Sequence, residues 1–196
     1  MKKIPTLFTR VFKSHNIVDI LPEVTEGMEW VLNGEGIATV KYDGACCAII
    51  DGKFYRRYDA KQGKPIPKNA IPCQESPDDI TGHFPCWIPC DRDNPDDKWF
   101  WRAYDNPQTD KKDNCTYEVI GVHFQGNPYN LKDDLLIQHG INIVEVERTF
   151  DGIREYLKNN YIEGLVFWKD EEPKCKIKRT DFGFEWNGKC SKEKHK

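Results

Sequence analysis

The residues with the clearest capacity for chemistry are Lys41, Asp43 and Gly44, which form a Lys-x-Asp-Gly segment between two apolar runs. The runs, 37–40 and 45–50, predict strands, so we expect Lys41 at a strand end. A lysine amine attacks an electrophile only when it is neutral, and nearby cations, a metal ion or desolvation favour that form by lowering its pKa. Gly44 would let the backbone approach a ligand closely. A match to such a short pattern often occurs by chance, so it indicates a function only when the surrounding elements agree with it.

Lys176 and Lys178 flank Ile177. In a strand this spacing places both ammonium groups on one face and the isoleucine on the other. Two cations on one face suit a triphosphate. An amphipathic strand with its lysines toward solvent explains the same pattern, and such alternation is routine in sheets.

Two glutamates accompany apolar runs. Glu118 lies within the apolar run 117–122, where a carboxylate needs a partner such as a ribose hydroxyl, a metal ion or an arginine. Glu163 precedes Gly164 and the apolar run 165–168. It is either a ligand for Mg²⁺ or a nucleotide sugar, or an ordinary turn residue before a strand.

Arg56 and Arg57 are neighbours in a predicted strand, so only one of them can face a given side of a sheet. His123 and His139 stand near glycines, and we interpret both as structural.

The elements that must position these residues are mostly strands. Asp51-Gly52 predicts a hairpin turn between the run 45–50 and a return strand. Residues 98–104 are aromatic-rich and predict another strand. Asp151 is a candidate cap for a helix that ends near residue 160. The chain therefore predicts a strand-dominated α+β domain.

Composition excludes several classes of protein. The chain has 196 residues, a net charge of -3, 31% charged residues and a mean hydropathy of -0.73. These values argue against a non-specific nucleic-acid coat, although a local basic groove stays possible. There is no long apolar run and no signal peptide pattern. The eight cysteines contain no C-x-x-C pair, and only Cys86 and Cys90 approach metal-ligand spacing. We expect reduced thiols in a cytoplasmic protein that acts as a monomer and does not bind membranes.

Five segments follow one another in an order typical of one enzyme superfamily. They are Lys41-x-Asp43-Gly44, an arginine, Tyr117-Glu118, Glu163-Gly164-Leu165-Val166 and Lys176-Ile177-Lys178. Their order resembles motifs I, Ia, III, IV and V of the covalent nucleotidyltransferases, which include RNA ligases, DNA ligases and mRNA capping enzymes.

Other segments resemble one branch more closely, the 5′-3′ RNA ligases related to the vertebrate RNA ligase. These segments are Lys41–Cys47, Gly82–Pro89, Gly126–Tyr129 and Ile162–Val166. The resemblance covers residues 37–184. It implies an adenylation domain with antiparallel sheets around an ATP cleft and no OB-fold. The expected division is an N-terminal segment, 1–36, packed on the core, a nucleotidyltransferase domain, 37–186, and a charged, disordered tail, 187–196.

The resemblance also implies a role for each site residue. Lys41 would be the catalytic nucleophile that forms lysyl-AMP, and Glu163 would bind the metal ion, Mg²⁺ or Mn²⁺. Arg57 is preferred to Arg56 because Arg57-Tyr58-Asp59 matches the Arg-x-Asp of the branch. Phe124 and Tyr129 are candidates for stacking on adenine. The ATP-binding set would be Asp43, Gly44, Arg57, Glu118, Lys176 and Lys178.

The implied activity is ATP-dependent joining of an RNA 5′-phosphate to a 3′-hydroxyl, as in RNA repair. Capping enzymes and DNA ligases use the same lysine and are alternatives, although they usually carry an OB-fold, which at this length a partner would have to supply. A non-catalytic nucleotide-binding or RNA-binding module and a chance Lys-x-Asp-Gly in a structural β core are the remaining alternatives.

Overall fold

The computed structural model describes residues 1–13, 16–79 and 81–188. Contacts divide the chain into two units. Unit 1 consists of Met1–Lys3 and Asp43–His139, and unit 2 of Ile4–Tyr42 and the chain from Gly140 onward. The chain therefore passes from unit 2 to unit 1 inside the Lys-x-Asp-Gly segment. The sequence-based division at residues 36 and 186 stays a prediction, and residues 189–196 of the expected tail lie outside the described residues.

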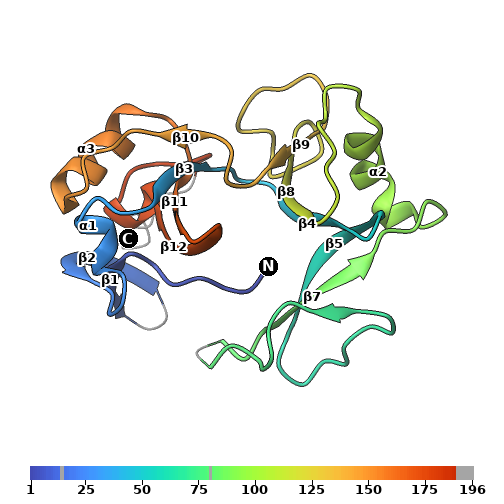
Figure 1. Cartoon of the computed structure of the whole chain (residues 1–196), viewed down its shortest axis with the longest axis horizontal. Coiled ribbons are helices and arrows are strands. Elements are labelled where there is room, and N and C mark those ends of the chain that lie inside the picture. The colour runs from blue at the N-terminus through green and yellow to red at the C-terminus, as the bar shows by residue number, and fades with distance from the viewer. Residues whose placement is uncertain (14–15, 80, 189–196) are drawn as a thin grey trace. The chain divides into compact units, whose positions relative to one another are not determined.

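Unit 1 contains, within the described residues, a six-stranded antiparallel sheet with the order β6-β7-β5-β4-β8-β9 (Figure 1). Its elements are β4 (Ala45–Ile50), β5 (Lys53–Ala60), β6 (Ile71–Pro72), β7 (Phe84–Pro89), the 3₁₀ turn η1 (Pro95–Asp97), α2 (Lys98–Asp105), β8 (Cys115–Ile120) and β9 (Leu135–Gln138).

Strand alternation divides the side chains of this sheet between two faces. One face packs a core that includes Cys47, Tyr117 and Val119 against aromatic residues of α2. The opposite face carries a smaller cluster with Ala48 and Tyr55. Residues that neighbour the core positions in sequence, such as Cys46 and Glu118, therefore lie on the face opposite α2.

Unit 2 contains, in the part of the chain that the structure describes, a four-stranded antiparallel sheet with the order β10-β3-β11-β12, and a separate β1-β2 pair. Its elements are β1 (Phe8–Lys13), β2 (Asn16–Val24), α1 (Glu29–Leu32), β3 (Ile37–Lys41), β10 (Ile143–Val144), α3 (Phe150–Asn159), β11 (Gly164–Lys169), β12 (Glu172–Lys178) and η2 (Arg179–Phe182). Ile153 and Leu157 of α3 and Leu165, Phe167 and Ile177 of the sheet are fully buried in one core.

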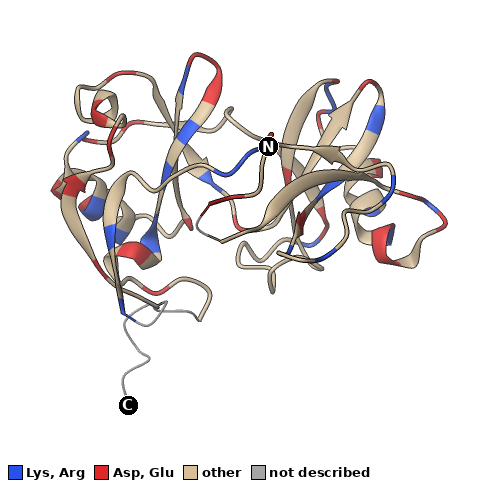
Figure 2. Cartoon of the chain, turned by 90° about the horizontal axis from the view of Figure 1, so that it is seen from below, with Lys and Arg blue, Asp and Glu red and all other residues tan. Residues whose placement is uncertain are grey.

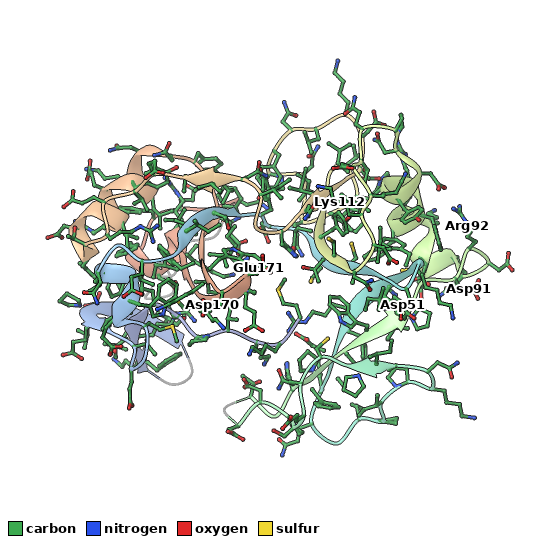
Figure 3. The ribbon with its side chains drawn as sticks, in the orientation of Figure 1. Asp51, Asp91, Arg92, Lys112, Asp170 and Glu171 are labelled. Atoms are coloured by element: carbon green, nitrogen blue, oxygen red, sulfur yellow. The ribbon has the colours of Figure 1, made fainter. Side chains whose placement is uncertain are left out.

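The hairpin expected at Asp51-Gly52 is present, and a second hairpin joins β11 to β12. Asp51 and Gly52 join β4 to β5 with positive φ angles of 49° and 71°, as a mirror-image hairpin turn requires. Asp170 and Glu171, which are labelled in Figure 3, join β11 to β12. Their φ angles are 54° and 60°. The second hairpin carries acidic residues (red) at its tip and lysines (blue) along its strands (Figure 2).

The α+β class with dominant antiparallel strands is confirmed, but two local predictions are wrong. Lys98–Asp105 is the helix α2, where a strand was expected. Thr149, and not Asp151, caps α3, because its side chain accepts a hydrogen bond from the backbone of Gly152. No helix among the described residues is long and apolar enough to cross a membrane.

Candidate functional site

Three adjacent strand ends bring Lys41, Glu163 and Lys178 together in unit 2. Gly164 pairs with Lys41, the last residue of β3, on one side. It pairs with Lys178, the last residue of β12, on the other side. Glu163 immediately precedes Gly164, so its side chain begins at the point where both lysines end their strands. The three residues are thus collected by strand register from segments far apart in sequence.

Glu163 bridges the two lysines. Its Oε2 lies 2.5 Å from Nζ of Lys41, and its Oε1 lies 2.6 Å from Nζ of Lys178. The Glu163 side chain is only 5% exposed, whereas the side chains of Lys41 and Lys178 are 21% and 35% exposed. A buried carboxylate therefore lies between two lysines that retain access to solvent.

The electrostatics of Glu163 follow from this arrangement. Burial by itself would raise the pKa of the carboxyl, because desolvation disfavours the charged form. The attraction of Lys41, that of Lys178 and the hydrogen bonds from both outweigh burial, so the pKa of Glu163 lies below its ordinary value. Glu163 is consequently an anion at neutral pH.

Gly164 is required where these strands meet. A Cβ atom at this position would lie 2.1 Å from the backbone oxygen of Ile177, which is far inside van der Waals contact. The close approach of β11 and β12 at this point therefore depends on glycine, and it brings the carboxylate of Glu163 within reach of Lys178.

Lys176 lies two residues before Lys178 on β12, and Ile177 between them is fully buried. The expected alternation of side chains along this strand is confirmed. Lys176 also exchanges backbone hydrogen bonds with the segment that leads into β1: its N–H donates to the oxygen of Pro5, and its oxygen accepts from the N–H of Leu7. The strand that carries both lysines is held on each of its edges.

The remaining predicted residues, Asp43, Gly44, Arg57 and Glu118, belong to unit 1. Cys47 pairs with Arg56 on β5, so Cys46, the preceding residue, lies opposite Arg57. Cys46 also pairs with Glu118 on β8. Arg57, Cys46 and Glu118 therefore form one row across the sheet. The row lies on the face opposite α2.

The two arginines are distinguished by their partners. Arg56 points toward the start of α2, where its Nε lies 2.6 Å from Oδ1 of Asp97, a side chain that is 1% exposed. Arg57 lies on the other face and donates from Nε to Oδ1 of Asp59 at 3.0 Å. Arg56 is thus engaged in a structural ion pair, which is consistent with the assignment of Arg57, and not Arg56, to a site.

Glu118 has two partners of its own. Oε1 accepts a hydrogen bond from the N–H of Gly44 at 3.1 Å, and Oε2 lies 3.0 Å from Nε2 of His139. A Cβ atom at Gly44 would lie 2.0 Å from the backbone oxygen of Val119, so this contact also requires glycine. The expectation that Glu118 needs a polar partner is met within the protein.

Tyr129 and Phe124, the candidates for stacking on adenine, differ in their surroundings. The hydroxyl oxygen of Tyr129 accepts a hydrogen bond from the N–H of Asp43 at 2.6 Å. Phe124 is 8% exposed and packs edge-to-face on Phe100, which leaves little of its ring for a base. Tyr129 is the better placed of the two relative to the Lys-x-Asp-Gly segment.

Sequence reasoning missed the surroundings of Glu118. His139 was interpreted as structural, and Cys46 was given no role, yet both lie beside this carboxylate. No local signal marks them, because Cys46 and Glu118 are neighbours only through the pairing of β4 with β8.

A metal ion at Glu163 would have to replace a lysine, since each oxygen of the carboxylate already contacts one ammonium group. Hard carboxylate oxygens do suit Mg²⁺, which is bound in proteins through one or two carboxylates together with substrate phosphates. The assignment of Glu163 to the metal therefore stays a prediction. Comparison of the chain with protein-family models and with curated proteins matched no family and no protein.

Proposed function

We propose that the protein is an ATP-dependent RNA ligase that forms a lysyl-AMP intermediate on Lys41. The observation that carries the proposal is the Lys41–Glu163–Lys178 cluster, in which a half-buried lysine and a second cation share one buried carboxylate at three strand ends. A surface strand with lysines toward solvent would not bury the carboxylate that both of them contact.

The cluster suggests how Lys41 is made reactive. Triphosphate oxygens compete with Glu163 for Lys178, and Lys176 on the same strand adds a further positive charge. When Lys178 turns to phosphate, the buried Glu163 loses one of the two cations that lower its pKa. Its proton affinity then rises, and it can accept the proton of Lys41 across the existing 2.5 Å contact.

The first step joins Nζ of Lys41 to the α-phosphorus of ATP, breaks the bond to the β-phosphate oxygen and releases pyrophosphate. In the second step a 5′-phosphate oxygen of RNA attacks the AMP phosphorus, and Nζ of Lys41 takes back a proton from Glu163 and leaves as the amine. In the third step an RNA 3′-hydroxyl attacks the activated 5′-phosphate, loses its proton and expels AMP. Mg²⁺ bound to the phosphates would spread the developing charge. The protein contributes positioning and charge neutralisation.

Asp43, Gly44, Arg57 and Glu118 keep the ATP-binding roles that the resemblance implies. We propose that the enzyme works as a monomer in the cytoplasm on RNA ends that carry a 5′-phosphate and a 3′-hydroxyl.

The test is covalent labelling with ATP that carries ³²P at the α-phosphate, followed by a denaturing gel. We expect a labelled band for the parent and none for Lys41→Arg, which keeps the positive charge beside Glu163 but lacks a usable amine nucleophile. Lys169→Ala is the matched control, because Lys169 ends a strand of the same sheet and pairs with Glu35 at 2.7 Å on the surface.

Loss of the band in Lys41→Arg and its retention in Lys169→Ala would support the proposal. Labelling of folded Lys41→Arg would refute it. A parent that labels with GTP but not with ATP would point to capping chemistry, and a folded parent that labels with neither would indicate a binding module.

A further inference from the structure

A cluster of three potential metal ligands lies on the face of the unit 1 sheet opposite α2. Cys46 comes from β4, Glu118 from β8, and His139 directly follows β9. Their ligand atoms, one thiol sulfur, one carboxylate oxygen and one imidazole nitrogen, all lie within 4.8 Å of one another. We propose that Cys46, Glu118 and His139 form a binding site for a divalent transition-metal ion, of which Zn²⁺ fits best.

The chemistry of the three ligands favours Zn²⁺. Sulfur, imidazole nitrogen and carboxylate oxygen are its three usual ligand atoms in proteins, whereas Mg²⁺ and Ca²⁺ take oxygen alone. Ligands of tetrahedral zinc are about 3.3–3.8 Å apart for bond lengths of about 2.0–2.3 Å. Side-chain rotation would bring the three atoms to this spacing, and a fourth position would remain for water or a substrate.

The backbone already fixes the three ligands. Cys46 and Glu118 are directly paired across β4 and β8. The N–H of His139 donates to the backbone oxygen of Thr116 at 3.0 Å, which anchors the histidine to the same strand as Glu118. Since a rigid sheet holds all three residues, binding would order little besides their side chains.

The imidazole of His139 also has an outer hydrogen-bond partner, as metal-binding histidines do. Its Nδ1 lies 3.0 Å from the hydroxyl oxygen of Thr116, while Nε2 faces Glu118. With a metal ion on Nε2, Nδ1–H would donate to the hydroxyl oxygen of Thr116. Such a second hydrogen bond fixes the tautomer and the orientation of the ring.

Metal binding would change the ionisation of Cys46. Burial, followed by the charge of Glu118, raises the pKa of the Cys46 thiol to about 12. The thiol is therefore a poor nucleophile by itself, and a metal ion bound to the sulfur would favour its thiolate form. Two positive charges already act on this thiol, the amino terminus of Met1 and Arg57, and Arg57 is paired with Asp59.

The three side chains are partly exposed. The side chains of Glu118 and His139 are 15% and 17% exposed, and Cys46 is half-buried. The site is therefore close to the surface, unlike the fully buried Cys47 that follows it in sequence.

The test is titration of the chelator-stripped, phosphine-reduced protein with Co²⁺, without nucleotide. Co²⁺ reports thiolate ligation through a sulfur-to-metal charge-transfer band, and Zn²⁺ should displace it. We expect one equivalent of Co²⁺ to produce the band in the parent, and we expect Cys46→Ser and His139→Gln to abolish it. Cys115→Ser is the matched control, because Cys115 is a half-buried thiol on the neighbouring strand that packs against the other face.

Thr116→Val keeps all three ligands and removes only the outer hydroxyl. It should weaken Zn²⁺ binding by about 10–100-fold, which keeps the proposal testable if a ligand variant does not fold. The proposal would be overturned if the folded parent gave no band, or if folded Cys46→Ser kept the band. It would also be overturned if Cys115→Ser lost the band to the same extent as the ligand variants. Glu118 is also assigned to ATP by the proposed function, but this titration contains no ATP, so failure of either proposal leaves the other unaffected.

Discussion

Replacing Glu163 with glutamine tests whether one buried charge holds the three strand ends of unit 2 together. The substitution keeps the size of the side chain and removes the charge that lies between Lys41 and Lys178. Loss of one member of a buried ion pair costs about 3–5 kcal/mol when the remaining charge stays buried. The side chains of these lysines are 21% and 35% exposed, so both can regain water. We therefore expect a loss of about 2 kcal/mol in the free energy of unfolding at neutral pH.

That loss corresponds to a decrease in Tm of about 4–8 °C for a chain of this size. Glu35→Gln is the control, since Glu35 pairs with Lys169 at 2.7 Å in the same unit but with 48% of its side chain exposed. An exposed pair contributes about 0–1 kcal/mol, so this variant should melt close to the parent. Both variants can be compared in one calorimetric or circular-dichroism experiment.

The dependence on pH gives a second measurement of the same quantity. Because the pKa of Glu163 is lowered in the folded protein, the stabilisation is present above the ordinary glutamate pKa of about 4.3. It is lost as the pH falls through the lower folded-state value, since the unfolded chain binds the proton first. The stability of the parent should therefore converge on that of Glu163→Gln in acid. Equal Tm values for Glu163→Gln and Glu35→Gln at neutral pH, or a constant gap down to low pH, would refute the reasoning.

The remaining predictions concern the two arginines and one glycine. Arg56→Ala should cost about 3 kcal/mol because it leaves the buried Asp97 without its cation, whereas Arg57→Ala should cost less than about 1 kcal/mol because its pair is partly exposed. Urea unfolding of both variants checks this difference, and equal losses would contradict the assignment of the two faces. Gly164→Ala should destabilise unit 2 by about 1–3 kcal/mol, because its methyl group meets the backbone oxygen of Ile177. Urea unfolding indistinguishable from that of the parent would show that the strands separate there without cost.

The prediction of a strand at residues 98–104 failed for an identifiable reason. Aromatic residues favour strands only weakly, and packing overrides that preference. Helix-start signals were present just upstream: Asn94 accepts a hydrogen bond from the N–H of Asp96, and Pro95 occupies the first position of η1. The aromatic side chains of α2 then cover the core face of the unit 1 sheet. The local sequence contained the start of the helix, but aromatic content was given more weight.

The candidate site could also be predicted only in part from the sequence. Period-two alternation in the sequence is enough to assign Arg56 and Arg57 to opposite faces, and Ile177 to the face away from Lys176 and Lys178. It cannot identify cross-strand neighbours, because those depend on register between strands that are distant in sequence. Lys41 and Glu163 are 122 residues apart, and Glu118 and His139 are 21 apart. Family resemblance could supply Lys41 and Glu163 as members of ordered motifs, whereas His139 belongs to none of those motifs. It becomes a candidate ligand only once β8 and β9 are paired.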